Sequence, residues 1–193
     1  FGMTQLNLYT LHTNLALFSN FTYFLDDPVN GDQFSQFDNR YQSAMNLSHL
    51  WVNRIGGLEV ENTAGIQFQN DVIDNGLLST KQRQTLSTTR KDHINQNSIG
   101  LYYQNSIQWL EKFRSVAGVR SDYYWFDVSS HQAVNSGKRY DSVTNPKISL
   151  IFGPWAQTEF YFNYGGGFHS NDARGTTTTV DPKSGDPVNR VNP

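Results

Sequence analysis

The sequence predicts an all-β fold, an antiparallel transmembrane β-barrel, and three observations lead to this prediction. Side chains alternate with a period of two, the expected connections alternate between short and long, and the polar strand faces carry few charges. A soluble β-sandwich shows the same alternation, with its polar face turned outward instead of inward. Alternation alone therefore leaves two architectures open, and the connection lengths and uncharged polar faces favour the barrel.

Length and composition exclude several other classes of protein. The chain has 193 residues and a formal net charge of -2, so it lacks the cationic excess that a nucleic-acid partner requires. Aromatic residues make up 14% of the chain, which argues against disorder. No apolar run approaches about 18 residues, which excludes a transmembrane helix but not a membrane-spanning strand. Cysteine is absent, which removes disulfides and thiolate metal sites.

The first expected strand, at 6–25, is long. Alternate residues from Tyr9 to Leu25 form a largely apolar face. About twenty residues at ~3.3 Å each span roughly 66 Å, whereas a tilted transmembrane strand needs only about 9–11 residues. We therefore expect this strand to project well beyond the bilayer.

The second expected strand, at 40–52, places two aromatic residues ten positions apart. Tyr41 and Trp51 share a face, with Met45 and Leu47 between them. Ten steps of ~3.3 Å, tilted by about 45°, rise roughly 23 Å, close to the ~25 Å apolar band between the aromatic girdles of a membrane barrel. The general preference of Tyr and Trp for strands explains the pair equally well.

The next two expected strands, at 58–69 and 96–109, show the clearest alternation. In each, one face is apolar apart from a single asparagine, Asn62 in the first and Asn105 in the second, and the other face is mainly polar. Further strands are expected at 114–128, 145–152 and 157–168.

The expected connections are short at one end of the strands and long at the other, as in outer-membrane barrels. Loops on a rigid scaffold commonly carry recognition, so the long connections are the candidates for ligand contact. The short connections are 53–57, 110–113 and 153–156, and the long ones are 26–39, 70–95, 129–144 and the tail 169–193.

No catalytic site and no metal site can be identified from the spacing of residues. His169, Ser170 and Asp172 are triad residue types, but a triad is assembled from distant segments, so we interpret them as turn residues. The five histidines include no pair at metal-ligand spacing, and no cofactor is expected. His93 and His131 also fall in or near long loops and, together with His169, could meet around a haem or metal-chelate ligand.

Three stretches resemble TonB-dependent outer-membrane receptors. They are LFSNFTYFLDDPVNGDQF at 17–34, GVRSDY at 118–123 and EFYFNYGGGFHSNDARG at 159–175, and the last is similar to a signature of one receptor subgroup. The resemblance covers essentially the whole chain and falls in the later part of the receptor barrel. It implies that 1–193 is a single partial barrel domain of about seven strands, from a barrel of about 22 strands, without the plug domain and the final strands.

The resemblance also implies a function. Such receptors lie in the Gram-negative outer membrane and import a scarce nutrient, such as a siderophore or other metal chelate, haem, cobalamin or an oligosaccharide, without enzymatic chemistry. The implied partners are outer-membrane lipid, the receptor's own plug domain and, through the plug, the TonB energy-coupling complex. Two alternatives remain: a passive porin-like channel, and a soluble β-sandwich that binds carbohydrate.

Two sets of residues are candidates for the site. Arg120, Asp122 and Glu159 are expected to face the lumen. The candidate ligand-binding residues are His169, Asn171, Asp172, Arg174, His93 and His131.

Overall fold

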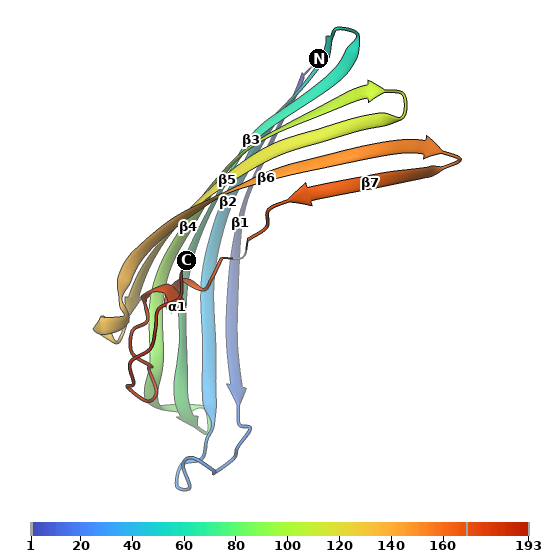
Figure 1. Cartoon of the computed structure of the whole chain (residues 1–193). Coiled ribbons are helices and arrows are strands. Elements are labelled where there is room, and N and C mark those ends of the chain that lie inside the picture. The colour runs from blue at the N-terminus through green and yellow to red at the C-terminus, as the bar shows by residue number, and fades with distance from the viewer. Residues whose placement is uncertain (1, 169, 193) are drawn as a thin grey trace.

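Seven strands form one antiparallel sheet in the computed structural model, which describes residues 2–168 and 170–192. Each strand pairs with the next strand along the chain (Figure 1). No helix among the described residues is long and apolar enough to cross a membrane. The strands are β1 (Gly2–Ser19), β2 (Phe34–Ile55), β3 (Leu58–Lys81), β4 (Gln84–Leu110), β5 (Phe113–Ser130), β6 (Gly137–Trp155) and β7 (Thr158–Gly165), and the helices are η1 (Ala133–Asn135) and α1 (Ala173–Thr177).

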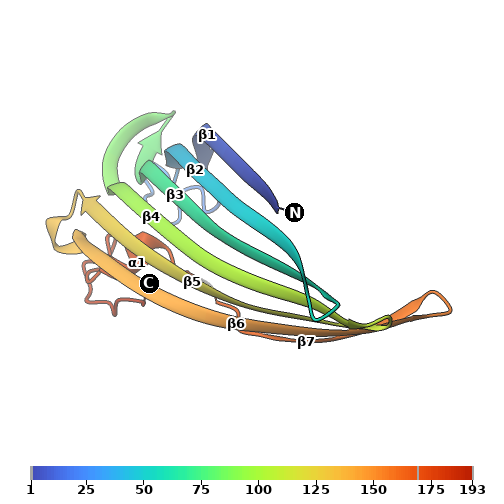
Figure 2. The ribbon, with the colours of Figure 1, turned by 90° about the horizontal axis from the view of Figure 1, so that it is seen from above.

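The sheet curls into a half-barrel, which is evident when it is viewed from above (Figure 2). Strands β1 and β7 form its two edges, and within the described part of the chain no second sheet packs against it. The all-β barrel prediction is confirmed. The β-sandwich alternative is wrong, because a sandwich requires two packed sheets.

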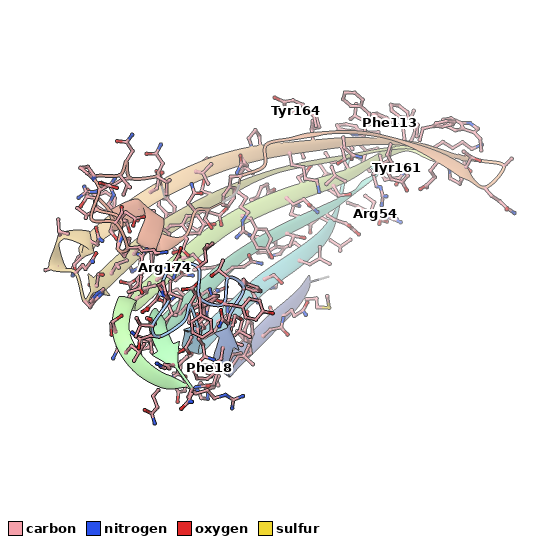
Figure 3. All side chains as sticks on the ribbon, turned by 90° about the horizontal axis from the view of Figure 1, so that it is seen from below. Phe18, Arg54, Phe113, Tyr161, Tyr164 and Arg174 are labelled. Atoms are coloured by element: carbon pink, nitrogen blue, oxygen red, sulfur yellow. The ribbon has the colours of Figure 1, made fainter. Side chains whose placement is uncertain are left out.

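From β2 to β7 the convex face of the sheet is mainly apolar and the concave face is mainly polar, whereas on β1 the side chains of Tyr9, Leu11, Leu15 and Leu17 lie on the concave face. Phe113 and Tyr164 project from the convex side, whereas Arg54, Tyr161 and Arg174 lie on the concave side (Figure 3). A soluble sheet buries its apolar face, whereas a membrane barrel turns that face toward lipid. Exposed apolar side chains of the convex face include Leu47, Leu101, Tyr103, Val119, Ile148, Phe160 and Phe162.

Aromatic residues and asparagines lie along this convex band. Tyr41 and Trp51 are both exposed on the convex face, as the girdle interpretation requires. Toward the loop end of the sheet, the Asn70 side-chain amide donates hydrogen bonds of 2.8 Å to both Asn95 and Asn97. These asparagines satisfy one another, which limits the cost of polar groups at the edge of an apolar surface.

The short connections are tight turns at one end of the sheet, as predicted. Each contains two residues, Gly56–Gly57, Glu111–Lys112 and Ala156–Gln157. Gly56 and Gly57 have φ values of 61° and 84°, the left-handed conformation that a type I′ hairpin turn requires and glycine adopts readily.

The region 70–95 is a hairpin and not the long loop that the sequence predicts. Strands β3 and β4 continue through it to a two-residue turn at Gln82–Arg83. The Asn75–Gly76 pair suggests a turn, but the absence of a side chain at Gly76 makes room for the ring of Phe37 on the neighbouring strand. This packing holds Gly76 inside a strand.

Three other predicted boundaries also move. β1 ends at Ser19 and not at residue 25. Half of 129–144 belongs to β6 and its first two residues belong to β5, so the connection after β5 is only 131–136. The loop that follows β1, residues 20–33, folds around Asp32, whose carboxylate accepts hydrogen bonds from the main-chain N–H groups of Leu25 (2.8 Å) and Asp27 (2.7 Å). Local side-chain to main-chain bonds of this kind compete with strand pairing.

Candidate functional site: the concave wall and the segment that folds onto it

The concave wall is made of straight rows of side chains. Strands β2 to β5 pair without a register shift through the middle of the sheet, so inward residues lie opposite one another on all four strands there. Most of the side chains in these rows are amides, acids or small residues. Three successive rows are Gln42–Asp71–Gln96–Phe126, Ala44–Gln69–Ser98–Tyr124 and Asn46–Gln67–Gly100–Asp122.

Glycine and aromatic residues pack against each other on this wall. The Tyr102 ring lies over Gly65, and the Arg120 side chain lies over Gly100. The Arg120 guanidinium carbon is also 6.0 Å from the centre of the Tyr102 ring, within reach of a cation–π interaction. The two glycines thus let larger neighbours lie flat along the wall.

Three arginines of the wall each pair with an acid two positions away on the same strand. Residues i and i+2 of a strand share a face, so the two charges meet without crossing to another element. Pairing of this kind offsets the cost of removing charges from water. The pairs are Arg40–Asp38 (3.4 Å), Arg90–Asp92 and Arg120–Asp122 (2.6 Å).

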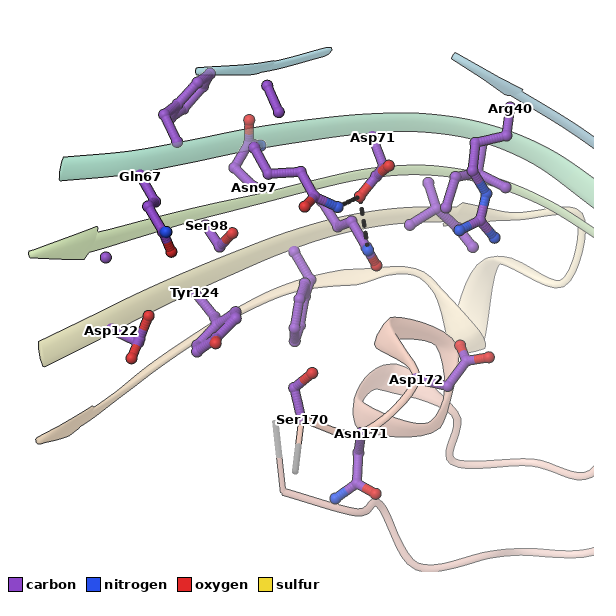
Figure 4. A pocket seen from close by; sticks show the side chains of 18 of the residues that line it. Arg40, Gln67, Asp71, Asn97, Ser98, Asp122, Tyr124, Ser170, Asn171 and Asp172 are labelled. Carbon is purple, nitrogen blue, oxygen red and sulfur yellow. Dashed lines mark hydrogen bonds between the residues drawn. The ribbon is translucent and has the colours of Figure 1, made fainter. Parts of the chain in front are cut away.

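Asp71 differs from the three acids in these pairs, because its carboxylate has only amide partners. It is 1% exposed, and its Oδ2 atom accepts hydrogen bonds from the side-chain amides of Gln69 (2.7 Å) and Gln96 (3.1 Å) (Figure 4). Its Oδ1 atom has no hydrogen-bond partner. This part of the wall therefore contains a buried carboxyl group with no basic partner among the described residues.

The segment that follows β7 turns back and covers the concave face (Figure 1). Helix α1 places Ala173 against Ile73, Ile94, Phe126 and Val128, and these five residues form the buried apolar cluster of the described chain. The small methyl group of Ala173 lets the helix approach the strands closely. The apolar cluster fixes the position of residues 170–174 over the wall.

An ion pair orders the start of this segment. The Arg174 guanidinium lies 2.5 Å from the Asp172 carboxylate, and Asp172 also caps helix α1 by accepting a hydrogen bond from the main-chain N–H of Arg174 (2.8 Å). Burial raises the pKa of Asp172, but the hydrogen bonds and charge of Arg174 outweigh it, so the net pKa lies below its ordinary value of 3.8. The hydrogen bond to Asp172 raises the pKa of Arg174.

A single asparagine in η1 clamps the other end of the segment. Asn135 is 1% exposed. Its side-chain oxygen accepts hydrogen bonds from the main-chain N–H groups of Thr179 (2.9 Å) and Val180 (3.0 Å), and its amide donates to the Val180 carbonyl (2.8 Å). The Arg90 guanidinium adds a hydrogen bond to the Thr178 hydroxyl (3.1 Å).

Between the wall and this segment lies a cavity of about 520 Å³. Strands β1 to β5 line it on one side, and residues 170–174 line it on the other (Figure 4). A volume in this range is typical of small-molecule sites. The cavity is therefore a candidate site for a small ligand.

Three of the candidate ligand residues line this cavity: Asn171, Asp172 and Arg174. His169 lies outside the described residues. His93 lies on the convex side of β4, where its ring bonds Asp74 (2.8 Å), so the expectation that it sits in a long loop is wrong. His131 follows β5 and accepts a hydrogen bond from the main-chain N–H of Lys91 (3.2 Å).

The three residues expected to face the lumen occupy two places. Arg120 and Asp122 line the cavity. Glu159 lies near the turn end of β7, where its carboxylate accepts a hydrogen bond from the Tyr161 hydroxyl, and it does not line the cavity.

Other residues of the site were not identified from the sequence. Tyr124 shares a strand face with Arg120 and Asp122, so the period of two was sufficient to place it there. Asn135 gave no such signal, because its partners lie more than forty positions away in the chain.

Four features define this sheet as the wall of an outer-membrane β-barrel. They are an apolar convex surface, a polar concave surface, tight turns at one end and loops folded inward at the other. The chain matches the family model described as TonB dependent receptor-like, beta-barrel over residues 2–193, and it belongs to that family. A search of curated proteins finds no match. The family is one of energised importers of the bacterial outer membrane, coupled to TonB, and is not a family of enzymes.

Proposed function

We propose that this chain forms part of the lumen wall of a receptor that imports a scarce nutrient, and that the nutrient binds in the cavity between the wall and residues 170–174. The cavity of about 520 Å³ is the observation that carries this proposal. Its lining comes from five strands and one inward-folded segment, so a bound molecule would touch both the rigid wall and the segment that covers it. Movement of that segment would then be linked to ligand binding.

We also propose that 1–193 is one partial barrel domain. Seven strands leave β1 and β7 with free edges, and a sheet in a membrane must close because unpaired main-chain groups are costly in lipid. Further strands of the receptor would pair with these edges, and its plug domain would occupy the lumen.

The first experiment replaces the candidate residues of the segment together. Alanine at His169, Asn171, Asp172 and Arg174 in the full receptor should weaken growth of a strain that depends on the receptor for a limiting nutrient. The matched control removes the Asp127–Lys138 ion pair (2.9 Å), in which both side chains are well exposed. Unchanged growth of the first variant, at normal surface level, would contradict the assignment of these residues.

A second measurement separates import from passive diffusion. An energised importer should lose uptake when the energy-coupling complex is removed and should show no large steady conductance in a planar bilayer. A porin-like channel would show the opposite pair of results. The segment at 170–192 covers part of the concave wall, which favours the importer.

A further inference from the structure

Within the cavity, one row of the concave wall begins and ends with an aromatic ring and has small or amide side chains between them. The row runs across five strands as Tyr9, Ala44, Gln69, Ser98 and Tyr124, and all five residues line the cavity. Four strand spacings of about 4.8 Å place the two tyrosines roughly 19 Å apart along the curved wall. Ala44 and Ser98 project little from the floor between them, and Gln69 supplies the one longer side chain.

The rings are placed to be contacted by a ligand. Tyr9 is 47% exposed, and Tyr124 is partly buried. Phe168 supports the Tyr124 ring in an edge-on contact, with ring centres 5.8 Å apart. An aromatic face held in this way offers a broad apolar contact surface at little cost in side-chain entropy.

The polar groups of the cavity are mostly neutral and both donate and accept hydrogen bonds. Six of its lining side chains are carboxamides, in Asn46, Gln67, Gln69, Asn75, Gln96 and Asn171. A carboxamide has two N–H donors and one oxygen acceptor. It therefore complements a hydroxyl group, which can donate one hydrogen bond and also accept hydrogen bonds. Groups of this type match a ligand with many hydroxyls better than one with a single sign of charge.

Charge excludes an anionic ligand. Among the described lining residues there are four carboxylates and three guanidinium groups, which gives the cavity a formal charge of -1. All three guanidinium groups are paired with an acid on their own segment, and Asp71 remains without a countercharge. An anionic chelate or a haem carboxylate needs an excess of cations, and this cavity has none to offer.

From this geometry we infer that the cavity binds a neutral oligosaccharide, laid along the row from Tyr9 to Tyr124 with a sugar ring against each tyrosine. This inference rests on the proposed import function and names the ligand class. The amides of the rows on either side supply hydrogen bonds to the hydroxyls.

The test uses the full receptor purified in detergent and two sets of probes. The neutral set is maltotriose, cellotriose and xylotriose, and the anionic set is ferric citrate and haemin. We expect saturable binding of at least one neutral trisaccharide, changed less than about twofold between about 50 and about 500 mM NaCl, because no net charge is neutralised.

Variants of neighbouring tyrosines then locate the site. Tyr124→Ala should weaken that binding about tenfold or more, and Tyr124→Phe, which keeps the ring, should stay within about twofold. Tyr123→Ala is the matched control, because Tyr123 is the next residue on β5 and lies on the convex face. It should leave binding unchanged, and a circular dichroism spectrum should show all three variants folded.

Three results would overturn the inference: salt-sensitive saturable binding of ferric citrate or haemin, binding of neutral sugars that Tyr124→Ala leaves intact, or binding of neither set. The proposed import function has its own readout. If no neutral trisaccharide binds but growth still depends on energy coupling, only the oligosaccharide assignment is rejected. Growth that does not depend on energy coupling would reject import, whatever the cavity binds.

Discussion

Replacement of Asn135 by alanine should release the inward-folded segment from the wall. The substitution removes three hydrogen bonds to Thr179 and Val180 from a buried position. At about 1 kcal/mol net for each bond, the attachment weakens by about 3 kcal/mol, and the population of the released state rises roughly 150-fold. The loss is large because the main-chain groups left behind are also partly buried.

Amide hydrogen exchange, read by mass spectrometry on the folded receptor, measures this release. The informative amides are those of Asp181, Val188 and Val191, which bond to other main-chain carbonyls of the segment and not to Asn135. Their exchange should accelerate in Asn135→Ala by up to the same factor. The control is Asn53→Ala, at an exposed position near the turn end of β2. Unchanged exchange at all three amides in a folded Asn135→Ala receptor would refute the clamp.

Three shorter predictions follow from the wall and the segment. Leu101→Arg places a charge on the lipid side and should cost about 2–4 kcal/mol in urea unfolding from vesicles, whereas Gln104→Arg on the concave side should cost little. Gly65→Val should cost about 1–3 kcal/mol in the same assay, because its side chain meets the Tyr102 ring, and Tyr102→Ala should relieve part of that cost. Because the pKa of Asp172 lies below 3.8 when folded, its contribution is present above that pH and is lost as pH falls through the lower value. Exchange of the segment, corrected for intrinsic rates, should therefore increase below about pH 4, and Asp172→Asn should abolish this dependence.

The period of two in the sequence was enough to assign side chains to the two faces of the sheet. It places Arg120 and Asp122 on one side and Val119 and Tyr123 on the other, and the structure has the same division. Alternation alone left the direction of the apolar face open. The curl of a single sheet settles it, because most apolar residues of β2 to β7 lie on the convex side, where no described protein layer covers them.

Local signals failed where distant contacts decide the structure. Asn75–Gly76 has the composition of a turn, yet Phe37 from another strand holds it in extended form. The tyrosine row depends on the register between β1 and β5, and no local pattern contains the register. Asn135 likewise acts on main chain far along the sequence, so its residue type alone did not reveal its role.

The hairpin of β3 and β4 gives the receptor a surface of fixed shape outside the cell. Its outward side chains beyond the apolar band are polar, among them Asp74, Lys91 and His93, and its tip is the two-residue turn at Gln82–Arg83. Antibodies raised against the folded receptor would recognise paired strands here, and a linear peptide of the same sequence would compete poorly for them. An epitope tag inserted between Gln82 and Arg83 would be displayed at the far end of a rigid support, which makes this turn the natural position for counting receptors on intact cells.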